Sequence, residues 1–181
     1  MNMITNNSQK KYSEKIEIMR NKILNEKYPW IYSKKNPDEI DFSSTPLDWL
    51  PTGWKISFGE ILLDEIDQVI KEENLTDFKI EEMKEKWGGL DIYVSFKDED
   101  GEISFTTDKL QELFEAFRAV SKNVCSSCGK IFVPTINCGY VIPLCRECYE
   151  EGTNSSVEYK DTCGFYDYKV TDILNRIIYK Q

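Results

Sequence analysis

The chain has 181 residues, enough for one domain with a sizeable core and a small added module, but too few for two large domains. Its 23 Lys and Arg are outnumbered by 32 Asp and Glu, and the net charge of -9 disfavours binding to nucleic acids or to anionic membranes. The chain contains no histidine. Hydrolytic mechanisms that depend on a histidine base are therefore excluded, and the charge is better suited to a protein partner with a basic surface.

The N-terminal segment is polar and predicts neither a signal peptide nor a folded element. Residues 1–11 have no apolar centre, and nowhere does the sequence approach the roughly 18 consecutive apolar residues of a membrane-spanning helix. We expect residues 1–11 to be disordered and the protein to be cytoplasmic, without membrane association. Because thiols stay reduced in the cytoplasm, paired cysteines are better interpreted there as metal ligands than as disulfides.

Helical periodicity begins near residue 12, and proline ends it. Apolar residues recur with helical spacing until Pro29 intervenes, so the first helix is predicted over residues 12–27. Residues 28–54 then contain four prolines among tryptophans and tyrosines. This composition predicts an irregular segment that packs on the domain through its aromatic side chains.

Two further helices are predicted from capping residues and apolar spacing. Ser57 and Glu60 have the spacing of an N-terminal capping box and precede an apolar helical face, which predicts a second helix over residues 58–72. Thr107 can cap a third helix, because an acidic residue and then a regular apolar face follow it. We place the third helix at residues 107–122.

Alternating apolar and polar residues between these two helices predict a small antiparallel sheet over residues 76–106. Gly88 and Gly89 mark the turn of a hairpin, since glycine tolerates the backbone angles of a tight turn. We expect Trp87 and Leu90, which flank this turn, to pack inward.

Four cysteines in two pairs carry the strongest chemical signal: Cys125, Cys128, Cys145 and Cys148. Each pair encloses two residues, and 16 residues (129–144) separate the pairs, a spacing typical of four-cysteine zinc sites. A site closed by four thiolates has no open coordination position, so its metal is structural rather than catalytic. We therefore predict structural Zn²⁺ bound by these four cysteines.

The residues around the pairs predict a treble-clef-like finger over residues 123–151. Gly129 follows the first pair, as in a zinc knuckle, where a tight turn favours glycine. Short apolar runs predict strands at 131–133 and 141–144, with a turn between them, and a helix is expected to open at Cys145. This order of knuckle, hairpin and helix resembles a treble clef.

Other uses of cysteine pairs fit the sequence less well. A thioredoxin-like redox pair leaves the second, matched pair unexplained. Treble-clef nucleases depend on histidine, and zinc deaminases need a further cysteine pair downstream of their catalytic glutamate, which this chain lacks. The remaining cysteines, Cys138 and Cys163, have no paired spacing, and we interpret them as small buried or free thiols.

Charge argues against two further functions but leaves them open as alternatives. Between the first and last ligand cysteines the only charged residues are Lys130, Arg146 and Glu147, which is not the basic patch of a nucleic-acid-binding finger. Carboxylates cluster at residues 81–85 and 98–102, where an acid/base pair would need a pocket that separates the two pKa values. Charge-dense runs beside turns are more often solvated surface.

The segment MKEKWGGLDIY at residues 83–93 resembles a Lys-Glu-Lys-aromatic-Gly-x-Leu turn found in a group of small uncharacterised bacterial and phage proteins. In that group a Gly-Trp pair precedes the turn and a cysteine-pair finger follows it. Here Gly-Trp at residues 53–54 and the finger occupy the corresponding places, so the resemblance covers roughly residues 49–150. Asp91 departs from the pattern, which has arginine there, and Trp87 stands where phenylalanine is more usual. The resemblance implies this order of parts and a phage or mobile-element context, without an activity.

Together these features predict an α+β fold with a core at residues 12–122, a finger at 123–151, and a loop and C-terminal helix at 152–181. The last helix is expected to be capped near Thr171 and to pack on the core. We expect a non-enzymatic, zinc-stabilised module whose acidic surface binds another protein, with an inhibitor or regulator encoded by a phage or mobile element as the specific hypothesis. A nucleic-acid-binding zinc finger protein and a carboxylate-dependent enzyme remain as alternatives.

Overall fold

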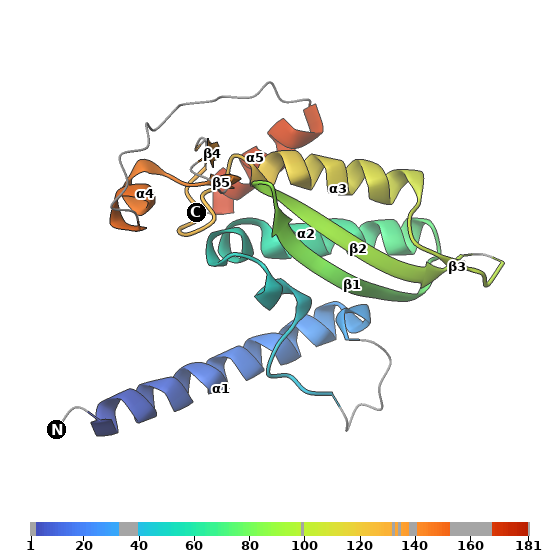
Figure 1. The fold of residues 1–181 in the computed structure, drawn as a ribbon. Coiled ribbons are helices and arrows are strands. Elements are labelled where there is room, and N and C mark those ends of the chain that lie inside the picture. Colours follow the sequence, from blue (N-terminus) through green and yellow to red (C-terminus); the bar gives the residue numbers. More distant parts are fainter. Residues whose placement is uncertain are drawn as a thin grey trace.

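The computed structural model describes residues 3–32, 40–98, 100–131, 133, 135–137, 141–152 and 168–180. Its main elements are α1 (Met3–Lys27), α2 (Thr52–Glu72), β1 (Thr76–Lys86), β2 (Gly89–Lys97), β3 (Ile103–Ser104), α3 (Asp108–Ser121), β4 (Thr135–Asn137), β5 (Val141–Pro143), α4 (Arg146–Gly152) and α5 (Tyr168–Lys180). Short 3₁₀ helices, η1 (Pro29–Ile31) and η3 (Pro46–Trp49), lie between α1 and α2. The architecture is the predicted α+β fold: an antiparallel sheet in the order β1-β2-β3 beside α2 and α3, with the finger elements at one end (Figure 1).

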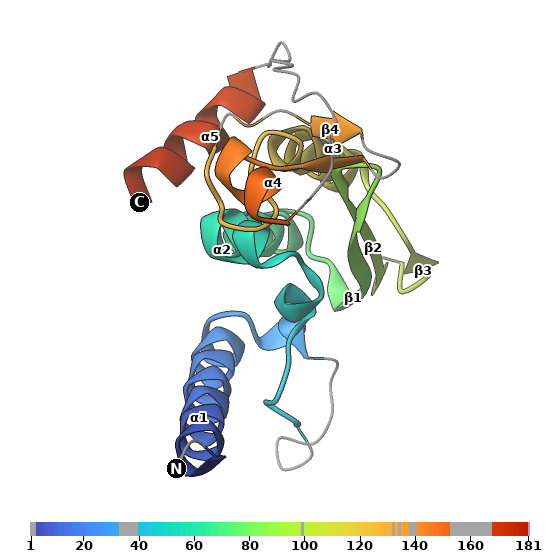
Figure 2. The same cartoon turned by 60° about the vertical axis from the view of Figure 1, so that its left-hand side comes forward.

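Helix α1 is longer than the sequence pattern predicted. It begins at Met3 rather than near residue 12. Residues 3–11, which were expected to be disordered, are therefore helical. No proline or glycine occurs before Pro29, and the stretch therefore contains no helix-breaking residue. Asn21, Leu24 and Tyr28 are buried toward its C-terminal end, while its N-terminal part projects away from the body (Figures 1 and 2).

Helix α2 begins earlier than predicted, at Thr52 rather than near residue 58. Pro51 occupies the N-cap position, and Ser57 therefore lies inside the helix rather than at its cap. Its hydroxyl donates a hydrogen bond to the carbonyl of Gly129 in the finger, at 2.9 Å. The capping-box interpretation of Ser57 and Glu60 is wrong, because the serine makes a long-range contact that spacing alone does not reveal.

The hairpin turn is displaced by one residue from its predicted position. Lys86 pairs with Gly89, so Trp87 and Gly88 form a two-residue turn, with φ angles of 54° and 75°. Two positive φ angles are the mark of a type I′ turn. Leu90 is buried as expected, but Trp87 is 71% exposed, because it lies at the tip of the hairpin and not on its inner face.

We expect the substitution Trp87→Asn to stabilise the protein by about 0.5–1 kcal/mol. A bulky side chain is strained at positive φ, whereas Asn-Gly is the preferred sequence of a type I′ turn. Urea unfolding at equilibrium measures the difference. Trp87→Phe, which keeps an aromatic residue at the same φ, should stay close to the wild type, and an asparagine variant less stable than both would contradict this interpretation of the turn.

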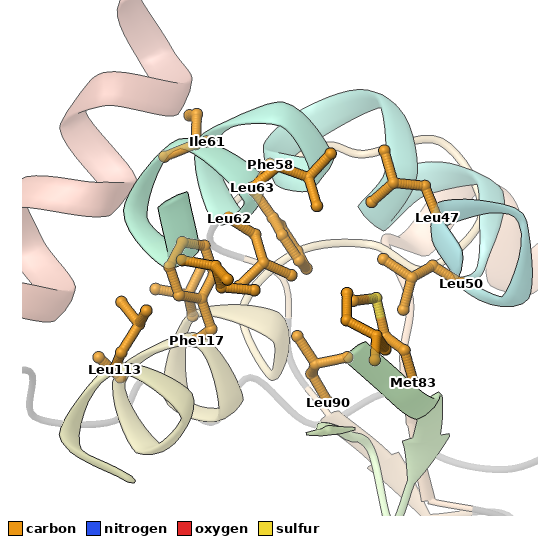
Figure 3. Packing of buried hydrophobic residues seen from close by; sticks show 14 of the residues in the cluster. Leu47, Leu50, Phe58, Ile61, Leu62, Leu63, Met83, Leu90, Leu113 and Phe117 are labelled. Carbon is orange, nitrogen blue, oxygen red and sulfur yellow. The ribbon is translucent and has the colours of Figure 1, made fainter. Parts of the chain in front are cut away.

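The core lies between the sheet and the helices. Figure 3 shows Met83 and Leu90 of the hairpin pointing into the same interior as Phe58 and Leu62 of α2 and Phe117 of α3. Helix α3 begins as predicted, with the Thr107 hydroxyl accepting a hydrogen bond from the backbone N–H of the residue three positions on. Helix α5 packs on α2 and α3, and it begins at Tyr168, so Thr171 lies inside the helix and not at the predicted cap. Its buried residues are Val170, Ile173, Leu174 and Ile177.

Asp48 connects α1, η3 and α2. Its carboxylate accepts hydrogen bonds from Arg20 of α1 and Lys55 of α2, each at 2.9 Å, and from the backbone N–H of Thr45 at 2.8 Å. Burial alone would raise the pKa of Asp48, but these three donors outweigh burial and lower the pKa from 3.8 to about 2. The folded state therefore favours the ionised carboxylate.

Asp48→Asn is expected to reduce the free energy of unfolding by about 1–2 kcal/mol at pH 7, because a one-unit pKa shift corresponds to about 1.4 kcal/mol. A carboxylate whose pKa is lowered by folding stabilises the protein fully above its unfolded pKa, near 3.8, and loses this contribution as the pH falls toward 2. The stability gap between variant and wild type, measured by urea unfolding at each pH, should therefore close below pH 4. A gap that stays constant down to pH 2 would contradict the linkage.

Candidate metal centre

The two cysteine pairs meet in one cluster. Their sulfur atoms all lie within 4.8 Å of one another, and Sγ of Cys128 is 3.7 Å from Sγ of Cys145. Four sulfurs bound tetrahedrally at 2.3 Å from a zinc ion would lie about 3.8 Å apart. The spacing therefore fits a single four-coordinate metal. All the predicted ligands belong to this cluster: Cys125, Cys128, Cys145 and Cys148.

The first pair lies in a knuckle that directly follows α3. The backbone N–H of Cys125 donates to the carbonyl of Lys130 at 2.7 Å, and the N–H of Gly129 donates to the carbonyl of Cys125 at 2.9 Å. Gly129 has a φ of 82°, which explains the glycine at this position. Ser126 joins the knuckle to the second strand of the finger, because its N–H and its hydroxyl both donate to the carbonyl of Pro143.

The second pair lies where β5 passes into α4. The helix starts directly after Cys145, as predicted, and β5 confirms the predicted second strand of the finger. The strand that pairs with β5 is β4, whereas Ile131, expected in the first strand, forms an isolated bridge with Val124 in the knuckle. Cys138 and Cys163, together with the turn expected between the two strands, lie outside the described residues.

Burial and backbone hydrogen bonds affect the four thiols differently. Cys125 and Cys145 are buried, Cys148 is half-buried and Cys128 is exposed. Burial opposes ionisation of Cys125, but hydrogen bonds from the backbones of Cys128, Cys145 and Ser127 outweigh it and lower the pKa of this thiol to about 7. Burial raises the pKa of Cys145 and of Cys128. A bound cation would offset the cost of ionising these thiols, since thiolates are the form that binds metal.

The knuckle packs on the first turn of α2, and a Gly-Trp pair makes this contact. The N–H of Gly53 donates to the carbonyl of Ser126 at 2.8 Å, and Nε1 of the fully buried Trp54 donates to the carbonyl of Val124 at 2.9 Å. A Cβ atom at Gly53 would overlap the carbonyl oxygen of Cys125. In the sequence this pair stands out only through the resemblance, because no local pattern places it beside the metal ligands.

Basic side chains of the finger are held in ion pairs. Nζ of Lys130 lies 3.2 Å from a carboxylate oxygen of Glu147, and a guanidinium nitrogen of Arg146 lies 3.7 Å from one of Glu150. Among the described finger residues, the basic groups therefore have acidic neighbours rather than forming a patch.

Carboxylates of the two acidic clusters accept hydrogen bonds from nearby groups in the sheet and its turns. Glu81 accepts hydrogen bonds from Lys79 and Ser95, and Glu85 accepts one from the backbone N–H of Gly88. Asp98 accepts backbone hydrogen bonds within its own turn. Several carboxylates have a pKa lowered by neighbouring donors, the opposite of what a catalytic acid needs: Asp48, Glu72, Glu81, Asp91 and Glu147.

Comparisons of the chain with protein-family models, with curated proteins and with solved structures found no match. The resemblance to small bacterial and phage proteins therefore stays a prediction. None of the described helices has both the length and the apolar character needed to cross a membrane.

Proposed function

We propose that this chain is a non-enzymatic cytoplasmic protein in which a structural zinc ion maintains a surface that binds another protein. The observation that carries the proposal is the closed cluster of four cysteines packed against the core. A tetrahedral zinc ion held by four thiolates has no position for substrate or water. The ion would act on the fold, because the knuckle that it closes is hydrogen-bonded to Gly53, Trp54 and Ser57 of α2.

Acidic charge supports a protein partner. With a net charge of -9, electrostatic steering would favour a partner with a basic surface and would oppose the approach of a nucleic-acid backbone. The ion pairs of Lys130 and Arg146 further weaken the case for a nucleic-acid-binding finger. An inhibitor or regulator encoded by a phage or mobile element is the specific form of the proposal, and it rests on charge, size and the resemblance.

Affinity capture from the native host tests the proposal when the metal-loaded chain is compared with Cys145→Ser. We expect the wild-type chain to retain a defined protein that the variant does not retain. A mobility-shift assay at low salt, with duplex DNA and with RNA, should show no binding. Nucleic-acid affinity that falls steeply with added salt would overturn the proposal in favour of the nucleic-acid-binding alternative.

A further inference from the structure

Helix α1 exposes an apolar stripe. Ile16, Met19 and Ile23 are 51%, 64% and 61% exposed, which is high for side chains of this kind. Their spacing of three and four residues places them on one face of the helix. This face is turned away from Asn21, Leu24 and Tyr28, the buried residues through which α1 attaches to the body. We call Ile16, Met19 and Ile23 the α1 stripe.

Basic residues border the α1 stripe on both sides. Lys15 and Lys22 each lie one helical turn from Met19 and form one border. Arg20 and Lys27 each lie one turn from Ile23 and form the other border. Glu14 and Glu17 lie toward the opposite face of the helix, whereas Glu26 lies on the face of the stripe, one turn after Ile23, and ends the apolar run there. The α1 stripe is thus an apolar seam between two basic borders, on a chain that is acidic overall.

The body of the protein holds part of these borders in place. Arg20 donates to Asp48 at 2.9 Å, and Nζ of Lys27 lies 2.8 Å from a carboxylate oxygen of Asp64. Both cations are still partly exposed, at 32% and 52% of the side-chain surface. These ion pairs, together with the buried side chains of Asn21 and Leu24, place one face of α1 against the body and leave the α1 stripe exposed.

Over one heptad the spacing of the α1 stripe is that of a coiled-coil seam, which ends at Glu26 in the next d position. Ile16 and Ile23 are one heptad apart, at a positions, and Met19 lies at d between them. Lys15 and Lys22 then occupy g, and Arg20 and Lys27 occupy e. A second copy of α1 would bring cations together across the seam in either orientation, because e and g are both basic. Charge complementarity instead selects a helix with acidic residues at these positions.

We propose that the α1 stripe binds an amphipathic helix of another protein, one with apolar residues at a and d and with Asp or Glu at e and g. This inference rests on the proposed function only in assigning a protein partner to the chain. The α1 stripe and its borders form a basic, apolar surface, distinct from the acidic surface assigned to the partner in the proposed function. The apolar seam supplies affinity by burial, and the basic borders select the partner.

Designed peptides test this inference on the full, metal-loaded chain. One probe is a four-heptad helical peptide with Leu at a and d and Glu at e and g, and its counterpart carries Lys at e and g. Fluorescence anisotropy should show that the Glu peptide binds at least tenfold more tightly than the Lys peptide, with an affinity that decreases between 50 mM and 500 mM salt. Equal binding of the two peptides, or no binding of either, would overturn the inference.

Variants locate the binding. Met19→Ser combined with Ile23→Ser should abolish binding of the Glu peptide, whereas Ile56→Ser, an equally exposed apolar position on α2, should not. Lys15→Glu combined with Lys22→Glu should shift the preference toward the Lys peptide. Unchanged metal content and thermal unfolding establish that these exposed substitutions leave the fold intact. A dimer in sedimentation experiments that Ile23→Ser disrupts would overturn the inference in favour of a second copy.

Affinity capture separates this inference from the proposed function. If the chain carrying Met19→Ser and Ile23→Ser still retains the partner captured by the wild type, the α1 inference fails and the proposed function stands. If the wild type retains no protein but still selects the Glu peptide, the proposed function fails and the specificity of the α1 stripe stands.

Discussion

Removal of the metal is expected to unfold the finger and to destabilise the core with it. Metal binding to such a site contributes on the order of 10 kcal/mol at neutral pH, comparable to the whole stability of a domain. Chelation in reducing buffer, or the substitution Cys145→Ser, should lower the midpoint of thermal unfolding by more than about 10 °C, since about 1 kcal/mol shifts it by 2–4 °C in a domain of this size. Circular dichroism measures the midpoint.

Tryptophan fluorescence reports on the contact between the finger and the core. Trp54 is fully buried and donates to Val124 directly before the first ligand cysteine, so opening of the knuckle exposes an indole. Tryptophan emission should therefore shift to longer wavelength on chelation and return when Zn²⁺ is added back. Ser127→Ala is the matched control, because Ser127 is an exposed knuckle residue whose side chain is no ligand. If chelation changes neither the midpoint of thermal unfolding nor the tryptophan emission maximum, the structural role of the metal is contradicted.

Gly53→Ala is expected to destabilise the protein by about 3 kcal/mol or more and to weaken metal binding. In an ordinary helix this substitution stabilises by up to about 1 kcal/mol. Here the added Cβ would overlap the carbonyl oxygen of Cys125 and approach the backbone nitrogen of Gly129 to 2.6 Å. Both obstacles are backbone atoms of the knuckle, so the alanine can be accommodated only if the knuckle moves away from α2.

Gly59→Ala, in the same helix, is the control. Its Cβ would lie 3.3 Å from Cδ2 of Leu47, an atom at the end of a flexible side chain, so the change in stability should stay within about 1 kcal/mol. Urea unfolding measures both variants, and competition with a chelator measures their metal affinity. A Gly53→Ala variant as stable as Gly59→Ala, with wild-type metal affinity, would show that the knuckle does not pack on α2 as described.

Local patterns were sufficient for the ligand set and for most elements. Pair spacing identified Cys125, Cys128, Cys145 and Cys148 as metal ligands. Each pair reaches one metal from a single tight turn, so the two ligands of a pair lie close together in the sequence and their spacing alone predicts the site. The cap at Thr107 was predictable for the same reason, since its hydrogen-bond partner lies only three residues away.

Long-range contacts decided the features that the sequence did not predict. Ser57 has the spacing of a cap, but its hydroxyl bonds to Gly129, far along the chain. Residues 131–133 have the composition of the first finger strand. However, Ile131 pairs with Val124, and the strand that pairs with β5 is β4. The hairpin turn contains two adjacent glycines that permit either register, and cross-strand pairing selects the turn at Trp87 and Gly88.

The most direct test of the account is the metal content of the purified protein. Elemental analysis of chain expressed without added metal and purified in reducing buffer should find about one zinc per chain, bound by four thiolates. Cys145→Ser should contain much less, and the wild-type protein should be colourless, whereas iron in the same site would absorb visible light. Fewer than about half a zinc per chain, or iron in its place, would contradict the central claim that a structural zinc ion closes this fold.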